Sequence, residues 1–138
     1  MRSCSENYCK TVCIEAQTMS DMARKQILPA VARYAADVAR DAAGKKALDA
    51  GISCGYETKL VKKLAAVTER IDTRVDALDS VTARLKTLSD VTEEADFIRD
   101  ELLSRMTELR AAADEAEILT AESCWPFPTY GDLLFSVK

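Results

Sequence analysis

Histidine is absent from this sequence, and glycine, proline and aromatic residues are scarce. The 138 residues include no histidine, four glycines and three prolines, and aromatic residues make up 6% of the chain. A protein without histidine lacks the commonest general base and the commonest metal ligand. A β-rich protein would need more glycine and proline to turn its strands. The composition therefore argues against both the usual acid–base enzymes and a β fold.

Motifs that bind nucleotides or activate a serine nucleophile are also missing, since the sequence contains no G-x-G-x-x-G, G-x-x-x-x-G-K-[ST] or G-x-S-x-G. Acidic pairs do occur, as at Glu93 and Glu94 or Glu115 and Glu117. On an exposed helix such pairs are ordinary solvated charges. We therefore predict that the chain holds no catalytic, cofactor-binding or metal-binding residue of its own.

The charge and hydropathy patterns exclude two further classes of partner. The net charge is -4 with a pI near 5.0, and no cluster of Lys and Arg is present to bind phosphates, so we expect no nucleic acid. No apolar run reaches the roughly 18 residues that would cross a bilayer, and the N-terminal MRSCSENYCK lacks the apolar core of a signal peptide. We therefore expect a cytoplasmic protein without a membrane partner.

The cysteines are odd in number and include no C-x-x-C pair; they are Cys4, Cys9, Cys13, Cys54 and Cys124. Structural zinc sites use closely spaced Cys and His ligands, so we predict reduced thiols that bind no metal. A redox pair of Cys9 and Cys13 is an alternative, because residues four apart share a helix face. Their β-carbons would lie about 5 to 6 Å apart, however, and a disulfide prefers roughly 3.8 Å.

Helical periodicity dominates what is present. Hydrophobic residues make up 48% of the chain and are mostly Ala, Leu and Val. A first apolar stripe predicts a helix over about 12–43 and consists of Ala16, Met19, Ala23, Ile27, Val31, Tyr34, Val38 and Ala42. Pro29 removes a backbone hydrogen bond to Lys25 and predicts a kink. Gly44 predicts the end of this helix, and residues 44–55 predict a linker.

Two more stripes predict helices over about 56–88 and 93–122. The second fills heptad positions a and d, apart from Arg74, with Leu64, Val67, Ile71, Leu78, Val81, Leu85 and Leu88. Such a seam needs a helical partner, and we favour one in the same chain over a dimer. The third stripe is Ala95, Ile98, Leu102, Met106, Leu109, Ala113, Ala116 and Leu119.

A boundary between these two helices is predicted because Asp90 can cap the start of a new helix. Glu93 follows three residues later, as in a capping box. The heptad phase nevertheless runs through this boundary, so one continuous helix is an alternative. With the break, the chain is predicted to be a single all-α domain over 1–138. It would be a bundle of about three long, mostly antiparallel helices of matched length, followed by a tail over 123–138.

The tail differs from the helices because it holds four of the eight aromatic residues and two of the three prolines. The prolines favour extended backbone. Its candidate docking residues are Trp125, Pro126, Phe127, Pro128, Tyr130 and Phe135. We interpret the rings as covering the open end of the bundle or docking on a neighbouring domain. As an alternative, residues 125–130 are a ligand for a proline-reading groove.

Several separated stretches carry a family resemblance. They are residues 8–12, 14–19 and 25–30 near the start, Met106, Leu109, Arg110 and Asp114 further on, and above all the WPFPTYGDLLF of residues 125–135. Together they resemble the C-terminal helical region of type III glutamine synthetases over residues 8–136. The resemblance implies a parent enzyme that joins glutamate and ammonia with ATP and a divalent metal in an upstream, β-containing catalytic region. No catalytic or metal-binding motif of that region has a match here.

The same resemblance implies the function that we predict. Because the family forms large rings of subunits, the chain would be a structural and oligomerisation module that is inactive alone. Its partners would be the catalytic core or neighbouring subunits, and it would itself be able to form a homo-oligomer. The alternative is a free-standing helical adaptor that binds another protein through the heptad seam or the WPFPTY strip.

Overall fold

The computed structural model describes the backbone of residues 2–128 and side chains from Tyr8 onward. Helices account for most of these residues, and no strand occurs among them. The elements are α1 (Arg2–Met22), a π-helical segment (Ala23–Ile27), α2 (Leu28–Leu48), α3 (Gly55–Leu85), α4 (Val91–Phe97), a second π-helical segment (Ile98–Leu102), α5 (Leu103–Leu119) and a short 3₁₀ turn, η3 (Glu122–Cys124). The predicted all-α fold is confirmed.

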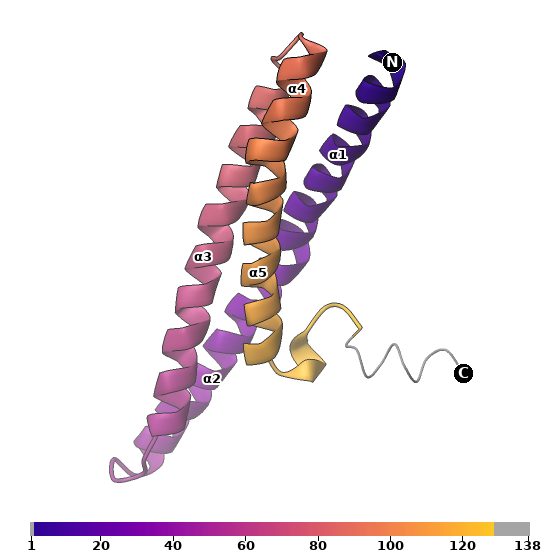
Figure 1. Cartoon of the computed structure of the whole chain (residues 1–138). Coiled ribbons are helices and arrows are strands. Elements are labelled where there is room, and N and C mark those ends of the chain that lie inside the picture. Colours follow the sequence, from indigo (N-terminus) through magenta and orange to yellow (C-terminus); the bar gives the residue numbers. More distant parts are fainter. Residues whose placement is uncertain (1, 129–138) are drawn as a thin grey trace, which may run out of the picture.

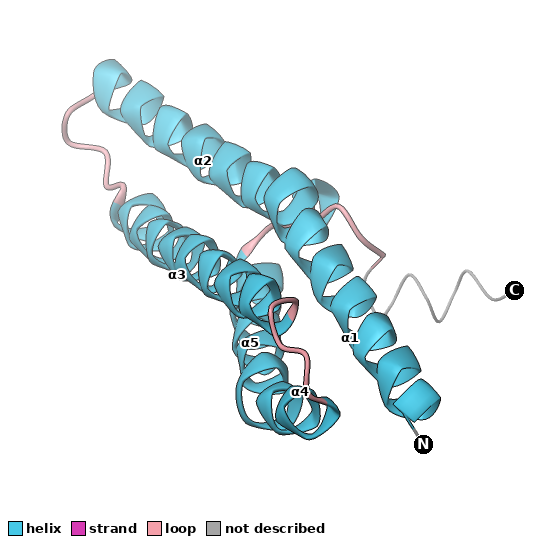
Figure 2. Cartoon of the chain, turned by 90° about the horizontal axis from the view of Figure 1, so that it is seen from above, coloured by secondary structure: helices cyan, strands magenta, loops and turns pink. Residues whose placement is uncertain are grey.

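Three rods form the bundle. The run from α1 to α2 passes along one side, α3 returns antiparallel to it, and α4 with α5 runs back along α3 (Figure 1). Seen from above, α3 lies between α2 and α5 (Figure 2), and it makes the main contacts with both. The lower end of α2 and the start of α3 extend beyond the end of α5 (Figure 1). The bundle therefore has three helices in one half and only two in the other.

The first rod is longer at both ends than the predicted helix over 12–43. It begins at Arg2 and passes through Gly44 without ending. Glycine inside a helix lowers the stability of the helix by about 1 kcal/mol, and the neighbouring turns offset this loss. Lys45 and Lys46 also favour the last turn, because cations stabilise a helix C-terminus. The predicted linker over 44–55 is thus reduced to residues 49–54, in which the Asp49 side chain accepts a 2.8 Å hydrogen bond from the Gly51 N–H.

Just before Pro29 the first rod widens into the π-helical segment Ala23–Ile27, where the N–H of Leu28 donates to the carbonyl of Ala23. Proline has no N–H, and its ring clashes with the carbonyl four residues earlier. A wider turn before it is a physical response to this clash. The kink at Pro29 itself stays a prediction.

The predicted break between the second and third helices is confirmed. α3 ends at Leu85 and α4 begins at Val91. The carboxylate of Asp90 accepts a 3.0 Å hydrogen bond from the Glu93 N–H, as an N-cap does. The continuous helix that the heptad phase allowed is therefore wrong. The last long helix ends at Leu119, three residues before the predicted end at about 122.

The core lies between the rods and is mostly the predicted one. Fully buried side chains with large volume include Val31, Leu64, Val67, Ile71, Val75, Leu78, Leu85, Ile98, Leu102 and Leu109. In α3, however, the heptad predicted burial at positions 74 and 81. The structure buries the next residues, Val75 and Thr82, instead. The buried stripe rotates because α3 packs against α2 on one side and α5 on the other. Arg74 instead donates to the carbonyl of Glu108 at 2.8 Å.

The third predicted stripe of buried residues was wrong at its N-terminal end. Ala95 is exposed, whereas Phe97 packs against the core. The π-helical segment Ile98–Leu102 lies just after these residues, and a wider turn changes the phase of the helix on either side of it. Ala112 is fully buried although the stripe passed over it.

Candidate docking site

The start of the tail turns back onto the bundle. Trp125 and Phe127 are partly buried and pack against the core, and their rings meet edge to face with centroids 6.1 Å apart and an interplanar angle of 76°. Pro126 and Pro128 are exposed. The other two candidate docking residues, Tyr130 and Phe135, lie outside the described residues. The structure thus brings two of the six candidates onto the helices.

A hollow of about 460 Å³ separates this part of the tail from the first rod. It is lined by Lys25, Gln26, Pro29, Ala30, Arg33 and Tyr34 from the rod and by Ser123, Cys124 and Pro126 from the tail. Burial, with smaller contributions from the neighbouring Tyr56 and Cys124, raises the pKa of Tyr34. Tyr34 therefore marks the place where the tail, α2 and the start of α3 approach one another.

A second hollow of about 630 Å³ continues along α2 and α3 at the two-helix end; we call it the hairpin groove. Its apolar lining is Tyr34, Val38, Leu48, Tyr56 and Leu60. Leu48 is 83% exposed and Tyr56 is 72% exposed, so this groove presents large apolar side chains to solvent. The hairpin groove was not predicted, because Leu48 was assigned to a linker and Tyr56 to the first residue of a helix.

An ion pair spans the floor of the hairpin groove. The Lys45 ammonium on α2 pairs with the Glu57 carboxylate on α3. The hydrogen bond from Lys45 is the main cause that lowers the pKa of Glu57, and the same bond raises the pKa of Lys45. Cys54, which is buried, adds a weak bond from its Sγ to the carbonyl of Ala42 at 3.4 Å. These contacts tie α2 to α3 where no third helix covers them.

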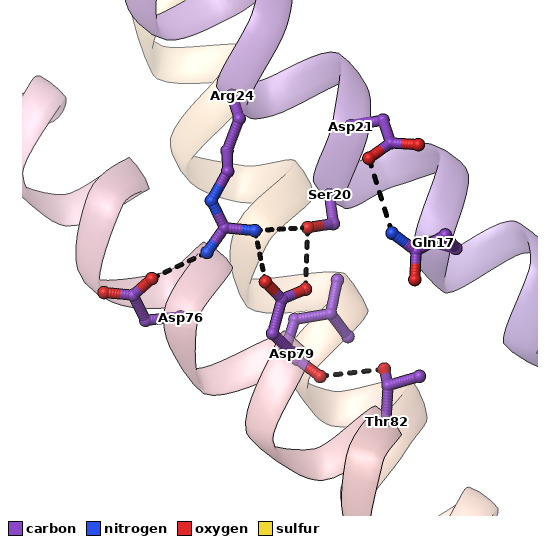
Figure 3. Close-up of polar contacts among 8 residues, drawn as sticks. Gln17, Ser20, Asp21, Arg24, Asp76, Asp79 and Thr82 are labelled. Carbon is purple, nitrogen blue, oxygen red and sulfur yellow. Dashed lines mark hydrogen bonds and ion pairs between the residues drawn. The ribbon is translucent and has the colours of Figure 1, made fainter. Parts of the chain in front are cut away.

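In the three-helix half, a polar cluster joins the first rod to α3 (Figure 3). The hydroxyl of the fully buried Ser20 donates to Asp79 Oδ1 at 2.7 Å. The Arg24 guanidinium donates to Ser20 Oγ at 2.8 Å and to Asp76 Oδ1 at 2.7 Å, and it also pairs with Asp79. The hydrogen bond to Asp79, followed by that to Asp76, raises the pKa of Arg24. We call these four residues the polar clasp.

The polar clasp was not predicted from the sequence either. One signal was available, because Ser20 occupies a stripe position between Ala16 and Ala23, both of which are buried. A hydroxyl on an apolar stripe needs a partner, since a buried polar group without one costs free energy. The identity of that partner depends on how α1 lies against α3, which the sequence did not indicate.

The described cysteines Cys9, Cys13, Cys54 and Cys124 form no disulfide. The pKa of Cys9 is raised to about 11, mainly by burial and also by the adjacent Cys13 and Glu94. A thiol with so high a pKa holds almost no thiolate at neutral pH, and the thiolate is the reactive form. The redox pair therefore has no support in the electrostatics of this site.

Within residues 8–128, whose side chains are described, no three His, Cys, Asp or Glu residues gather in a way that would hold a metal ion. No helix in the same described part of the chain has the length and hydropathy needed to span a membrane.

Comparison with known proteins agrees with the resemblance. A family model described as the glutamine synthetase C-terminal domain matches residues 2–46. A glutamine synthetase of Butyrivibrio fibrisolvens is 33% identical over 133 residues, which cover 96% of this chain and 19% of that protein. The chain is similar to the C-terminal region of glutamine synthetases. A type-3 glutamine synthetase of Dictyostelium discoideum is 25% identical over 134 residues, covering 94% of this chain and 18% of that protein. No solved structure matches.

Two features of the chain follow from the matches. The chain spans about a fifth of the length of the curated relatives that it matches. The family model covers α1, the first π-helical segment and nearly all of α2, so it includes Ser20 and Arg24 of the polar clasp and Tyr34 of the hairpin groove.

Proposed function

We propose that this chain is a structural module of an ATP-dependent glutamate–ammonia ligase, in which it packs against the catalytic region or neighbouring subunits and performs no catalysis alone. The observation that carries the proposal is the alignment of 96% of the chain to a fifth of a glutamine synthetase. A segment of that share is an appendage to a larger protein in that relative. Its helices supply contact surface rather than reacting groups.

The distribution of apolar residues supports a packing role. The rods bury a core of their own, yet Ile14 is 66% exposed and Ile118 is 83% exposed, in addition to Leu48 and Tyr56 in the hairpin groove. Single exposed apolar residues are ordinary, but the hairpin groove brings two of them, Leu48 and Tyr56, together. Such a surface fits a region that is covered in a larger assembly.

ATP and a divalent metal belong, on this proposal, to the rest of the parent enzyme. The described residues of this chain do not fit a metal site, because their acidic and thiol groups do not converge. No catalytic step is therefore assigned to them. The cytoplasm is the compartment that we expect for such an enzyme.

A chimera tests the proposal. In the Butyrivibrio glutamine synthetase, the segment that matches this chain would be replaced by residues 1–138, and assembly would be measured by size exclusion with light scattering. We expect the chimera to reach the mass of the native enzyme and to form glutamine. A chimera carrying Ile71→Asp, which disrupts the bundle, is the matched control and should fail to assemble.

Two results contradict the proposal. One is a chimera that folds by circular dichroism but stays unassembled. The other is formation of glutamine from glutamate, ammonia and ATP by the isolated chain, persisting after repurification and absent from an identically purified Ile71→Asp variant.

The adaptor function is the second candidate. It needs the rings of the WPFPTY strip to be available to another protein, whereas Trp125 and Phe127 are partly buried against this chain's own core. This packing favours the structural module. If the adaptor function holds, Trp125→Ala abolishes binding of a defined foreign protein and leaves the assembly of the chimera unchanged.

A further inference from the structure

Positive charge gathers in the hollow of about 460 Å³ between the first rod and the start of the tail, which we call the tail hollow. Lys25 and Arg33 line it on the rod, and no acidic side chain is among the described residues that line it. This local charge is opposite in sign to that of the whole chain, which is -4. The volume is within the range of roughly 300 to 1,000 Å³ that small-molecule sites occupy.

The guanidinium of Arg33 has no partner in the part of the chain that the structure describes. Most of the other described arginines pair with a carboxylate, a carbonyl or an aromatic ring. Asp37, one turn further along the same face of α2, could have served as the counter-ion, but it pairs with Arg40 at 3.3 Å. The side-chain donors of Arg33 are therefore open to a ligand.

The ammonium of Lys25 is likewise unpaired among the described residues. Asp21, about one turn before it, accepts a 3.3 Å hydrogen bond from the side-chain amide of Gln17 instead (Figure 3). The neighbouring Arg24 occupies the carboxylates of the polar clasp. Two cations of the tail hollow thus face it without a counter-ion from the described chain.

Neutral hydrogen-bond donors complete the lining. They are the amide of Gln26 and the hydroxyl of Tyr34 on the rod, and the hydroxyl of Ser123 on the η3 turn. Because burial raises the pKa of Tyr34, its hydroxyl keeps its proton at neutral pH and is able to donate. Hydrogen bonds from cations to oxyanions are about twice as strong as those between neutral groups. The lining as a whole therefore suits a negatively charged ligand.

We propose that the tail hollow binds a small oxyanion, a molecule that carries a phosphate or carboxylate group. Arg33 and Lys25 would supply the charge, and Tyr34, Gln26 and Ser123 would supply neutral donors. The flat guanidinium of Arg33 fits two oxygens of such a group at once. Because the lining comes from the rod and from the tail, a bound anion would hold the two together. This inference goes beyond the proposed function and does not depend on it.

The spacing of the two cations permits a shared ligand. Lys25 and Arg33 are eight residues apart, which is about 12 Å along a helix. Pro29 and Ala30, which line the hollow between them, are small and leave the space above the rod open. Both cationic side chains are exposed, so they can turn toward an anion in this space without a large cost of desolvation.

Fluorescence of the full chain tests the site, because Trp125 is the one tryptophan in the sequence and lies between Cys124 and Pro126 of the lining. The chain would be titrated with sodium phosphate and, separately, with sodium acetate, with sodium chloride holding the ionic strength constant. We expect a saturable change with at least one of the two oxyanions. Saturation by phosphate identifies a phosphate ligand, and saturation by acetate alone identifies a carboxylate ligand.

A charge-matched pair of variants locates the binding. Arg33→Gln should weaken binding by about tenfold or more, because it removes charge-assisted hydrogen bonds. Arg110→Gln is the control, since Arg110 is an exposed arginine on α5 that does not line the hollow. This control removes the same charge and should leave binding unchanged. Equal thermal melting of the two variants by circular dichroism shows that folding is not the cause of a difference.

Backbone amide shifts in NMR give a second readout of the same titrations. We expect saturable shifts within residues 25–34 and 122–126, and none within residues 103–119 of α5. The proposal is overturned if neither fluorescence nor amide shifts saturate with either oxyanion, or if sodium chloride alone reproduces the changes. It is also overturned if Arg33→Gln and Arg110→Gln weaken binding equally, because the anion would then respond only to net charge.

Discussion

The two halves of this bundle share α3 but differ in what covers it. Where all three rods lie together, Ile71, Leu78 and Leu102 are fully buried. Where α2 and α3 continue alone, Leu48 and Tyr56 are mostly exposed, and the last buried apolar residue of α2 is Val38. A helix pair buries one stripe on each member, but only a third helix closes the flank between them. Stability should therefore be concentrated in the three-helix half.

The largest expected effect is in the centre of that half. Ile71→Asp should unfold the chain, because burying a charge without a partner costs several kcal/mol, and a domain of this size has about 5 to 15 kcal/mol of stability. Thermal melting followed by circular dichroism measures the effect. Ile118→Asp, at a position that is 83% exposed, is the matched control and should melt like the wild type. An unchanged melting curve for Ile71→Asp would place this residue outside the core.

A pair of leucines compares the two halves directly. Leu102→Ala should lower the free energy of unfolding by about 2 to 5 kcal/mol, because it leaves a cavity at a fully buried site. Leu48→Ala in the hairpin groove should change it by less than about 0.5 kcal/mol, because this side chain is 83% exposed. Urea unfolding gives both values. Equal losses at the two positions would mean that the halves are equally covered.

The polar clasp should show an intermediate effect. Ser20→Ala removes the buried hydroxyl that bonds Asp79 and receives a bond from Arg24, and we expect a loss of about 1 to 3 kcal/mol. Thr18→Ala, which removes an exposed hydroxyl bonded only within its own helix, is the control. If both substitutions have the same small effect in urea unfolding, the clasp contributes nothing beyond local helix structure.

The smallest effect concerns pH at the two-helix end. The pKa of Glu57 is lowered in the folded chain, so its pair with Lys45 contributes stability above the ordinary value of 4.5 and loses it as the pH falls below that value. Glu57→Gln should therefore melt at a lower temperature than the wild type near pH 7, with the difference shrinking below about pH 4.5. Glu69→Gln, at an exposed position on the same helix, is the control. A difference that stays constant with pH would contradict the role of the pair.

The sequence predicted the elements better than their contacts. Ile98, Leu102 and Leu109 were read from spacing alone, and the Asp90 cap was read from a local pattern of side chains. Gly44 was misread as a helix end because its weak propensity is offset by the turns around it. Ala95 was wrongly predicted to be buried, because a π-helical segment changes the phase of an apolar stripe. No residue type predicts where such a segment occurs.

The candidate site was predicted less well, for a related reason. Trp125 and Phe127 were identified because aromatic rings beside prolines stand out in any sequence. Leu48, Tyr56 and Leu60, which line the hairpin groove, do not stand out, since similar residues elsewhere in the chain are covered. Their exposure depends on the position of another helix.

Helical spacing of apolar residues and the cap at Asp90 determined the three rods from the sequence by itself, because both act between residues a few positions apart. Only the tertiary structure decided that Val75 and Thr82 are buried beside Arg74, that Ser20 meets Asp79, and that α2 and α3 project beyond α5. These features depend on the length and register of helices distant in sequence. The physical reason is that burial is a property of two surfaces in contact, whereas periodicity describes only one of them.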